Sequence, residues 1–149
     1  MDAKEFLSGA FRMDQQVQSK LEQIEALRSL AEKMTIRITR DPVSRTPDPS
    51  GMENTVIRIL EAEEELNRRI DALVEMKMRI GRVIEQVRDP TLRLILEKRY
   101  LLFERWDEIS IDLDFTQRWT LMKHQDALDA VQEILDREEN ESEAGSCLD

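Results

Sequence analysis

The stretch FTQRWTLMK, residues 115–123, combines an amide, a guanidinium and several apolar side chains within two helical turns. Gln117 and Arg118 carry the groups that hydrogen-bond to adenine and guanine edges in a DNA groove. Leu121 and Met122 cannot donate such hydrogen bonds, so they can touch only thymine methyl groups or protein. The alternative interpretation is that these residues form the exposed first turns of an ordinary helix.

Two short elements are predicted to position this stretch. Trp106, Ile109 and Leu113 are spaced three and four apart, which predicts a short helix over Trp106–Leu113 with one buried face. Thr116 can cap a second helix, because a threonine hydroxyl accepts hydrogen bonds from free amides of the first turn. The buried side of this second helix is predicted to comprise Thr120 or Leu121, then His124, Ala127, Leu128, Val131, Ile134 and Leu135.

A short helix, a tight turn and a longer helix form the helix-turn-helix plan, whose second helix presents its first residues to the major groove. The candidate DNA contacts are therefore Thr116, Gln117, Arg118, Trp119, Met122 and Lys123. Candidates for contacts to backbone phosphates lie in the locally basic segment before it: Arg93, Lys98, Arg99 and Arg105. A solvated helix face is the alternative for these four. For Trp119 and Met122 the alternatives are a partner-binding patch or, favoured here, packing beneath the preceding helix.

Two long helices are predicted before this segment. Apolar or small residues recur every three or four positions from Phe6 to Ile38. The pattern resumes from Met52 to Val87, where Glu63 and Lys77 replace an apolar residue at two interior positions. Between them RDPVSRTPDPSG, residues 40–51, contains three prolines and cannot continue a helix. Residues 1–88 are therefore predicted to form a long antiparallel helical hairpin with a Pro-rich loop. Extra apolar positions, including Leu60 and Val74, indicate that it packs on the C-terminal unit or on a second copy, which makes a homodimer the expected state.

Asp89 and Pro90 mark the next boundary, since aspartate suits the cap and proline the first position of a helix. Residues 89–137 are predicted to form the helix-turn-helix domain, beginning with a helix over roughly Pro90–Phe103. Residues 138–149 are predicted to be a disordered acidic tail that contains the only cysteine, Cys147. Aromatic residues are few and clusters of β-branched residues are scarce, so the whole chain is predicted to be all-α.

The overall charge restricts the class of function. A net charge of −10 disfavours loose, charge-driven binding of nucleic acid. No signal segment or apolar stretch of membrane-spanning length is evident, and the single cysteine fits a reducing compartment, so a cytoplasmic location without membrane contact is expected. The sequence offers no nucleophile with a neighbouring base and only one histidine, His124, which is interpreted as structural. We therefore expect a non-enzyme with neither metal nor cofactor.

The stretch LRLILEKRYLLFERWDEISIDLDFTQRWTLMKHQDALDAV resembles the helix-turn-helix of sigma-factor region 4. It resembles more closely a family of small regulators encoded by phages and prophages of Gram-positive bacteria. Those proteins also begin with a segment like AKEFLSGAFRMDQQVQSKLEQIEALR and have a Pro-marked central loop. The resemblance therefore covers nearly the whole chain, up to about Leu135. Some are late transcription activators of the ArpU and RinA kind, and others have no assigned function. The resemblance implies a sigma-like domain that contacts DNA, RNA polymerase or both in the bacterial host cell.

Three positions depart from that family. Asp114 stands where the turn usually has glycine, although aspartate tolerates a left-handed backbone better than most residues. Thr120 replaces a branched apolar residue and Lys123 replaces leucine, and both changes are expected to weaken the buried side of the recognition helix.

Three functions follow as hypotheses. The first is a phage-type transcriptional regulator that binds DNA weakly alone and is helped by dimerisation or by polymerase. The second is a protein adaptor whose helix-turn-helix no longer reads DNA and uses Trp119, Leu121 and Met122 instead. The third is a DNA-packaging recognition subunit, although such proteins tend to place the DNA domain first in the chain. The first hypothesis requires that the leading end of the Thr116–Leu135 helix be free for a ligand.

Overall fold

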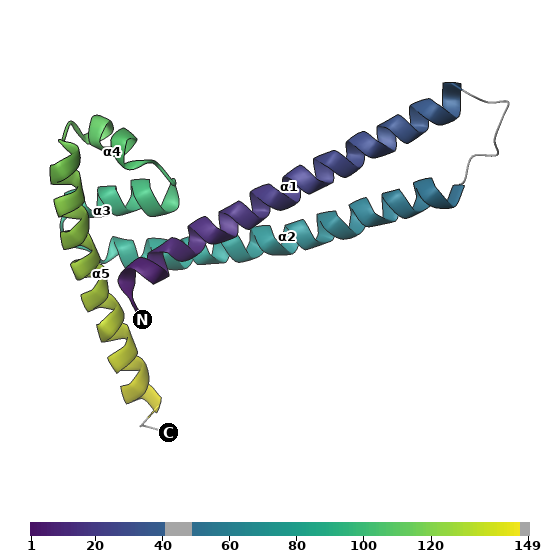
Figure 1. Cartoon of the computed structure of the whole chain (residues 1–149). Coiled ribbons are helices and arrows are strands. Elements are labelled where there is room, and N and C mark those ends of the chain that lie inside the picture. The colour runs from purple at the N-terminus through teal and green to yellow at the C-terminus, as the bar shows by residue number, and fades with distance from the viewer. Residues whose placement is uncertain (41–48, 147–149) are drawn as a thin grey trace. The chain divides into compact units, whose positions relative to one another are not determined.

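The computed structural model describes residues 1–40 and 49–146, and within these ranges every regular element is a helix (Figure 1). The helices are α1 (Ala3–Arg40), α2 (Pro49–Glu85), α3 (Pro90–Leu96), α4 (Trp106–Leu113) and α5 (Gln117–Ser146), with a π-helical turn over Glu97–Leu101 directly after α3. The prediction of an all-α chain is confirmed. None of the helices in the described ranges is long and apolar enough to cross a membrane.

The chain divides into two compact units. One contains residues 13–72, and the other contains residues 1–12 together with 73–149. This division differs from the predicted boundary at 88/89, because the first turns of α1 and the last turns of α2 share a core with the C-terminal helices. Helical periodicity identifies the buried face of a helix, but it does not identify the element that covers that face.

In the unit of residues 13–72, α1 and α2 lie side by side and antiparallel (Figure 1). Lys20 Nζ lies 3.0 Å from Glu65 Oε2, and Arg69 Nη2 lies 2.8 Å from Glu65 Oε1. The hydrogen bond from Arg69, followed by that from Lys20, lowers the pKa of Glu65 to about 2. At the other end, Thr55 Oγ1 lies 3.8 Å from Met34 Sδ. The Lys20–Glu65 and Thr55–Met34 pairs join the two helices and define their register, whereas Arg69 and Glu65 pair within α2.

The apolar stripes match this arrangement in part. Val17, Ile24 and Leu66 are buried as predicted, whereas Val56 is exposed and the prediction of its burial is wrong. A straight helix has 3.6 residues per turn, so a seven-residue pattern drifts around the helix and leaves Val56 at the edge of the seam. The half-buried Thr55 faces α1 there instead. The side chain of Ile38 lies outside the described residues.

The predicted loop at residues 40–51 is wrong at both of its ends. α1 continues through Arg40, and α2 begins at Pro49. Proline lacks an amide hydrogen, but the amides of a first helical turn have no partner within the helix, so proline is tolerated there. Residues 41–48, which include the other two prolines of the segment, lie outside the described part of the chain.

The other unit has a closely packed apolar core. α5 packs along α3 and α4, and α4 also contacts the π-helical turn. The core includes side chains from each helix of this unit that are buried almost completely: Leu7, Ile80, Ile84, Ile95, Leu96, Ile109 and Val131. Burial of each such side chain stabilises the fold by about 1.5–3 kcal/mol. This core holds α4 and the first turns of α5 in a fixed relation.

The segment that connects α2 to α4 begins as predicted and then departs from a regular helix. Asp89 Oδ1 accepts a hydrogen bond of 2.9 Å from the Thr91 amide, and Pro90 is the first residue of α3, so the predicted cap is confirmed. The expected continuous helix to Phe103 is wrong, because its last turn is π-helical and ends at Leu101. Phe103 has a left-handed backbone with φ of 58°, which an aromatic residue adopts only when its surroundings impose it. Its ring packs 5.6 Å from that of Phe11, and Lys77 Nζ lies 4.6 Å from its centroid.

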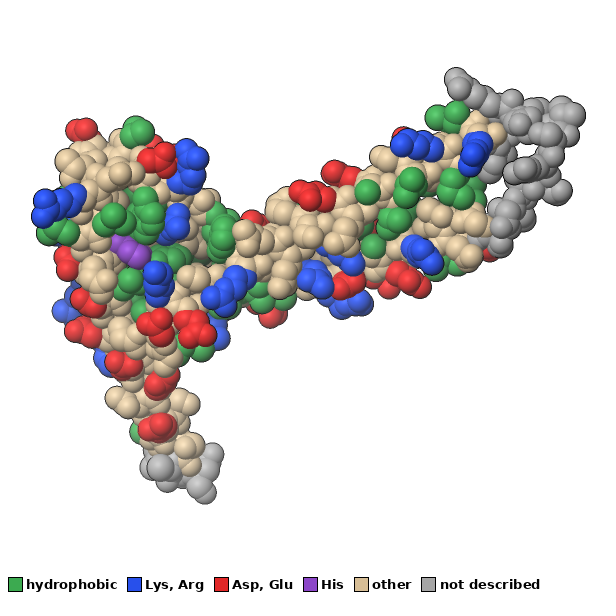
Figure 2. All heavy atoms as spheres, viewed as in Figure 1, with side chains coloured by type: hydrophobic (Ala, Val, Ile, Leu, Met, Phe, Trp, Pro, Cys, Tyr) green, Lys and Arg blue, Asp and Glu red, His purple; other side chains and the backbone are tan. Residues whose placement is uncertain are grey.

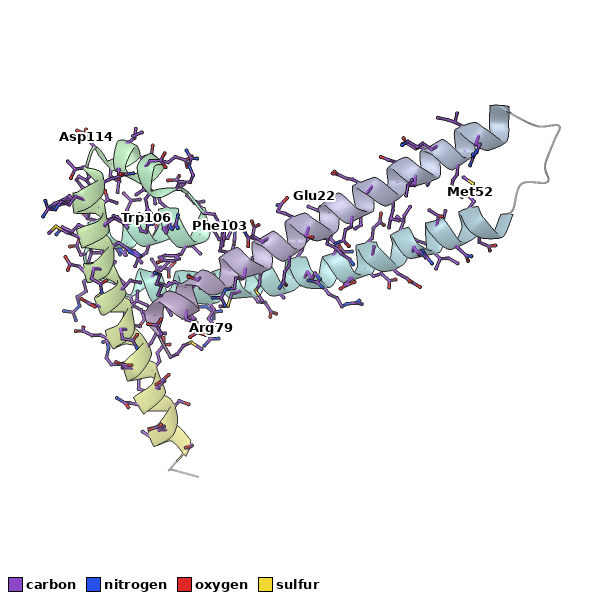
Figure 3. The ribbon with its side chains drawn as sticks, viewed as in Figure 1. Glu22, Met52, Arg79, Phe103, Trp106 and Asp114 are labelled. Carbon is purple, nitrogen blue, oxygen red and sulfur yellow. The ribbon has the colours of Figure 1, made fainter. Side chains whose placement is uncertain are left out.

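A three-residue turn joins α4 to α5. The predicted bounds of α4 are confirmed, and Asp114 ends the helix in the left-handed conformation that was expected there, with φ of 57° and ψ of 42°. The Phe115 amide donates to the Ser110 carbonyl at 2.9 Å and closes the turn. Figure 3 labels Asp114 at this bend, and Figure 1 shows α4 and α5 at a steep angle to each other. The chain is therefore not one unbroken helix through this point.

Replacing Asp114 by Gly is expected to stabilise the protein. A left-handed backbone costs a residue with a Cβ atom about 1–2 kcal/mol and costs glycine almost nothing, although glycine loses part of this gain by its freedom in the unfolded chain. The expected net gain is about 0.5–1 kcal/mol, measured by denaturant unfolding. Asp112→Gly, inside α4, is the matched control and should destabilise. A loss of stability in Asp114→Gly would show that the aspartate side chain itself holds the turn.

The acidic C-terminal segment is helical, which corrects the prediction of a disordered tail at residues 138–149. α5 continues through Ser146, with residues 136–146 exposed. This segment is rich in Glu, contains no proline, and has its single glycine, Gly145, only near the end of the helix. It therefore has no strong helix breaker before that point. Residues 147–149, including Cys147, lie outside the described part of the chain.

Candidate nucleic-acid interface

The first two turns of α5 form an exposed face at the end of the bend. Thr116, Gln117 and Arg118 are exposed, and so are Leu121 and Met122, which are 48% and 58% exposed. The leading end of the helix is therefore free for a ligand, as the helix-turn-helix hypothesis requires. Leu121 was considered for contact with thymine methyl groups or protein but was left out of the list of DNA contacts, although its spacing of four residues from Gln117 places it on the same face.

Thr116 is the cap of α5, and this prediction is confirmed. Its Oγ1 accepts a hydrogen bond of 3.2 Å from the Trp119 amide, and its carbonyl accepts one of 3.0 Å from the Thr120 amide. The Gln117 and Arg118 amides belong to the first turn, where helix geometry provides no partner within the helix. These amide groups and the helix dipole favour an anionic group at this end.

Trp119 lies on the surface, so the expectation that it packs beneath α4 is wrong. Its side chain is 38% exposed, and its ring meets that of Phe115 edge to face at 4.1 Å between centroids. Lys123 Nζ lies 4.9 Å from the Trp119 ring centroid on the flank of the helix. The favoured burial of Met122 is also wrong. The cluster of Phe115, Trp119 and Lys123 borders the exposed face on one side.

A buried hydroxyl pair supports this face from below. Thr120 is fully buried, and its Oγ1 donates to the Thr116 carbonyl at 3.0 Å. Ser110 Oγ lies 3.0 Å from Thr120 Oγ1 and 2.8 Å from the Trp106 carbonyl oxygen. Because both buried hydroxyls have partners, Thr120 occupies this core position without leaving an unsatisfied polar group. Lys123 is half-buried on the helix flank and lies over Trp119 rather than in the core.

Two of the four phosphate-contact candidates are paired with carboxylates of their own chain. Lys98 Nζ lies 3.3 Å from Asp112 Oδ2 and 3.7 Å from Glu104 Oε2. Arg105 Nη2 lies 3.1 Å from Asp107 Oδ2 and Nε lies 3.5 Å from Glu108 Oε1. A phosphate would have to compete with these carboxylates for either cation.

The other two candidates differ in what holds their side chains. Arg99 donates to the Glu104 carbonyl at 3.0 Å, and its guanidinium lies 4.8 Å from the Trp106 ring centroid. Arg93 is half-buried on α3 and has no ion pair within the described ranges. Figure 2 shows hydrophobic and basic side chains near the N-terminal half of α5 and acidic side chains along its C-terminal half. On the first two turns of α5 itself, Arg118 and Lys123 carry positive charge and have no ion pair within the described ranges.

His124 belongs to a polar and aromatic cluster behind the exposed face. Its Nε2 lies 2.6 Å from the Tyr100 hydroxyl, and its ring centroid lies 4.4 Å from that of Trp106, which Figure 3 labels. Burial, together with the positive charges of Lys4 and Arg99, lowers the pKa of His124 to about 4. Burial also raises the pKa of Tyr100 to about 12. At pH 7 the imidazole is therefore neutral, and its Nε2 can accept a hydrogen bond from the Tyr100 hydroxyl, as expected of a structural histidine.

Acidification is expected to destabilise the unit that contains His124. The unfolded imidazole titrates near 6.5 and the folded one near 4, so the unfolded chain binds the proton first. The stability conferred by neutral His124 is complete above pH 6.5 and is lost as the pH falls toward 4. We expect the thermal midpoint to fall between pH 7 and about pH 5, and His124→Gln to remove most of that fall. An equal fall in the variant would assign the pH dependence to other groups.

Comparison of the chain with protein-family models, with curated proteins and with solved structures finds no match. In the described ranges, no three His, Cys, Asp or Glu side chains lie together as a metal site would require.

Proposed function

We propose that this protein is a non-enzymatic transcriptional regulator of the phage type, which binds DNA through the first two turns of α5. The observation that carries this proposal is the combination of the left-handed bend at Asp114 with a free, exposed face at the start of α5. The resemblance of residues 92–131 to a sigma-type helix-turn-helix supports the same assignment. In such a fold the start of the second helix enters the major groove.

The distribution of charge supports weak binding by a single copy. Arg118 and Lys123 lie beside the exposed face, and Lys98 and Arg105 are neutralised by neighbouring carboxylates. Each phosphate contact contributes a slope of about 0.9 to the dependence of log affinity on log salt. With two such cations we expect a slope of about two for one copy, and an affinity that needs help from a second copy or from RNA polymerase.

Self-association is part of the proposal. Val56 and Leu60 are exposed and lie four residues apart on α2, so they form an apolar strip on one helix face. Two linked DNA-binding units raise affinity by roughly a hundredfold or more without a new contact to DNA. Light scattering at micromolar concentration tests this part, and a monomeric mass would remove it.

The experiment that tests DNA binding begins with selection from a library of duplexes with a randomised core. The enriched duplex is then titrated with the whole protein by fluorescence anisotropy across a salt series. We expect an enriched sequence, an affinity that falls as salt rises, and a slope that Lys123→Ala reduces by about one. Failure to enrich any sequence, with and without RNA polymerase, would contradict the proposal.

A protein adaptor is the second candidate, because the exposed surface at the start of α5 includes apolar side chains. Trp119 and Met122 are residue types that are enriched in the centres of protein interfaces. For an adaptor, Trp119→Ala would abolish function in the folded protein, whereas Gln117→Ala and Arg118→Ala would leave it intact. Activity of the three variants in a transcription assay with polymerase therefore separates the two candidates.

A further inference from the structure

The exposed face of α5 contains two apolar side chains directly beside its two hydrogen-bonding side chains. Met122 follows Arg118 by four residues, and Leu121 follows Gln117 by four, so each pair lies on one ridge of the helix. The step of one turn is about 5.4 Å along the axis, and one base step of DNA is about 3.4 Å. A methionine one turn from Arg118 would therefore meet a base one or two steps from the base that Arg118 contacts.

Negative charges limit this face to the first two turns. Asp126 and Asp129 are exposed in the third and fourth turns, and Asp129 accepts a hydrogen bond of 3.3 Å from Gln125. Carboxylates repel DNA phosphates, so close approach is confined to the region from Gln117 to Lys123. Within this region Arg118 has no ion pair with another described residue, and its charge is free for a ligand.

We propose that Met122, flanked by Leu121, recognises the methyl group of a thymine one or two steps from the base read by Arg118. This inference rests on the proposed binding of DNA by α5 and goes further by assigning part of its sequence preference to apolar contact. Thymine is the only base that presents a methyl group in the major groove, and apolar side chains distinguish it by that group.

The observations favour DNA over a protein as the occupant of this face. Stable protein interfaces use about 20–30 residues a side, whereas Leu121 and Met122 are two apolar side chains bordered by Gln117, Arg118 and the acidic turns. Trp119, which would be the natural anchor for a protein partner, is partly covered by Phe115 and Lys123. The positive charge of Arg118 and the free amides of the first turn match an anionic ligand.

Uracil substitution tests the proposal directly. The duplex enriched from the randomised library is resynthesised with uracil in place of each thymine in turn, which removes only the methyl group and keeps every hydrogen-bonding atom. Burial of one methyl group is worth about a fourfold change in affinity. We expect a loss of about this size at one or two thymines that lie within two steps of a guanine, and no change elsewhere.

Met122→Ala assigns the contact to its residue. In this variant the thymine and uracil duplexes should bind equally, each about as weakly as the uracil duplex binds the wild type. Met78→Ala is the matched control, because Met78 is a helical methionine of similar exposure, 60%, on α2. It should keep the fourfold difference. Unchanged thermal unfolding of both variants shows that they are folded.

The outcomes separate this inference from the proposed function. Enrichment of a duplex whose affinity ignores every uracil substitution, or a uracil effect that persists in Met122→Ala, would overturn the inference and leave DNA binding by α5 in place. Failure to enrich any duplex would overturn both. Binding of RNA polymerase that depends on Met122 without any DNA would assign the face to a protein partner and would also overturn the inference.

Discussion

Arg118→Ala is expected to weaken binding of the enriched duplex by roughly tenfold to a hundredfold and to relax the preference at one base pair. A well-placed arginine that bonds to both acceptors of guanine contributes about 1–3 kcal/mol of discrimination. Arg118 is exposed on the first turn of α5 and has no ion pair in the described ranges, so its removal leaves no buried charge behind. Thermal stability should therefore change little. Anisotropy titrations with the enriched duplex and with a scrambled duplex measure both effects.

Arg68→Ala is the matched control for this variant. Arg68 is exposed on α2, also has no ion pair in the described ranges, and belongs to the unit of residues 13–72. Its replacement removes one positive charge and should leave the affinity for both duplexes nearly unchanged. Similar losses in Arg68→Ala and Arg118→Ala would mean that binding depends on overall charge and not on the α5 face.

Ile109→Ala is expected to have the largest effect on stability. Ile109 is fully buried on α4, in the core against which the first turns of α5 are held. Truncation of a buried isoleucine costs about 2–5 kcal/mol, because the removed atoms lose their burial and a cavity remains. The free energy of unfolding, measured in denaturant, should fall by this amount. DNA binding should also weaken, because α4 and α5 are then held less firmly at their angle.

Ile111→Ala provides the control within the same helix. Ile111 is two residues away and 78% exposed, so its replacement should change stability by no more than about 0.5 kcal/mol. Equal destabilisation by the two substitutions would contradict the packing of α4 that the structure describes.

The order and type of the helices near the bend could be predicted from local chemistry. Asp89, Pro90 and Thr116 occupy helix starts because of what their side chains do to the first turn, and such signals need no tertiary information. The three- and four-residue spacing of Trp106, Ile109 and Leu113 likewise specifies one buried face. For this reason the predicted bounds of α4 agree with the structure.

The division into units could not be predicted in the same way. A heptad pattern continues through α1 and α2 without any sign of where the partner of the buried face changes. Residues 1–12 and 73–88 were therefore assigned to the hairpin, although they share a core with α3 and α5. The C-terminal segment was predicted to be disordered because it is acidic. It is instead helical through Ser146, because it is rich in residues that favour helix and contains no proline.

The sequence predicts which residues of the candidate site share one exposed helix face. It does not predict which of the basic residues are paired with carboxylates. Spacing alone places Gln117, Arg118 and Met122 at the start of α5, and these residues are exposed together. The pairing of Lys98 with Asp112 joins residues 14 positions apart, and it depends on how α4 packs beside the π-helical turn. Local basic composition therefore overestimated the number of cations that are free to meet phosphates.

An acidic chain can read DNA if its contacts are few and depend on shape and apolar matching more than on charge. The α5 face fits this description, with one free arginine, one glutamine and two apolar side chains ahead of acidic turns. Electrostatic attraction, which supplies most non-specific affinity, would then be small. A regulator built in this way would discriminate strongly between sequences only when a partner supplies the remaining affinity.

Amide NMR of the isotope-labelled whole protein, titrated with the enriched duplex, is the most direct test of the claim that the start of α5 is the DNA-binding surface. We predict that the largest shifts fall on residues 116–123, with smaller ones on α4 and at the π-helical turn, and that a scrambled duplex produces them only weakly. Shifts confined to α1 and α2, or spread evenly over the chain, would contradict this assignment.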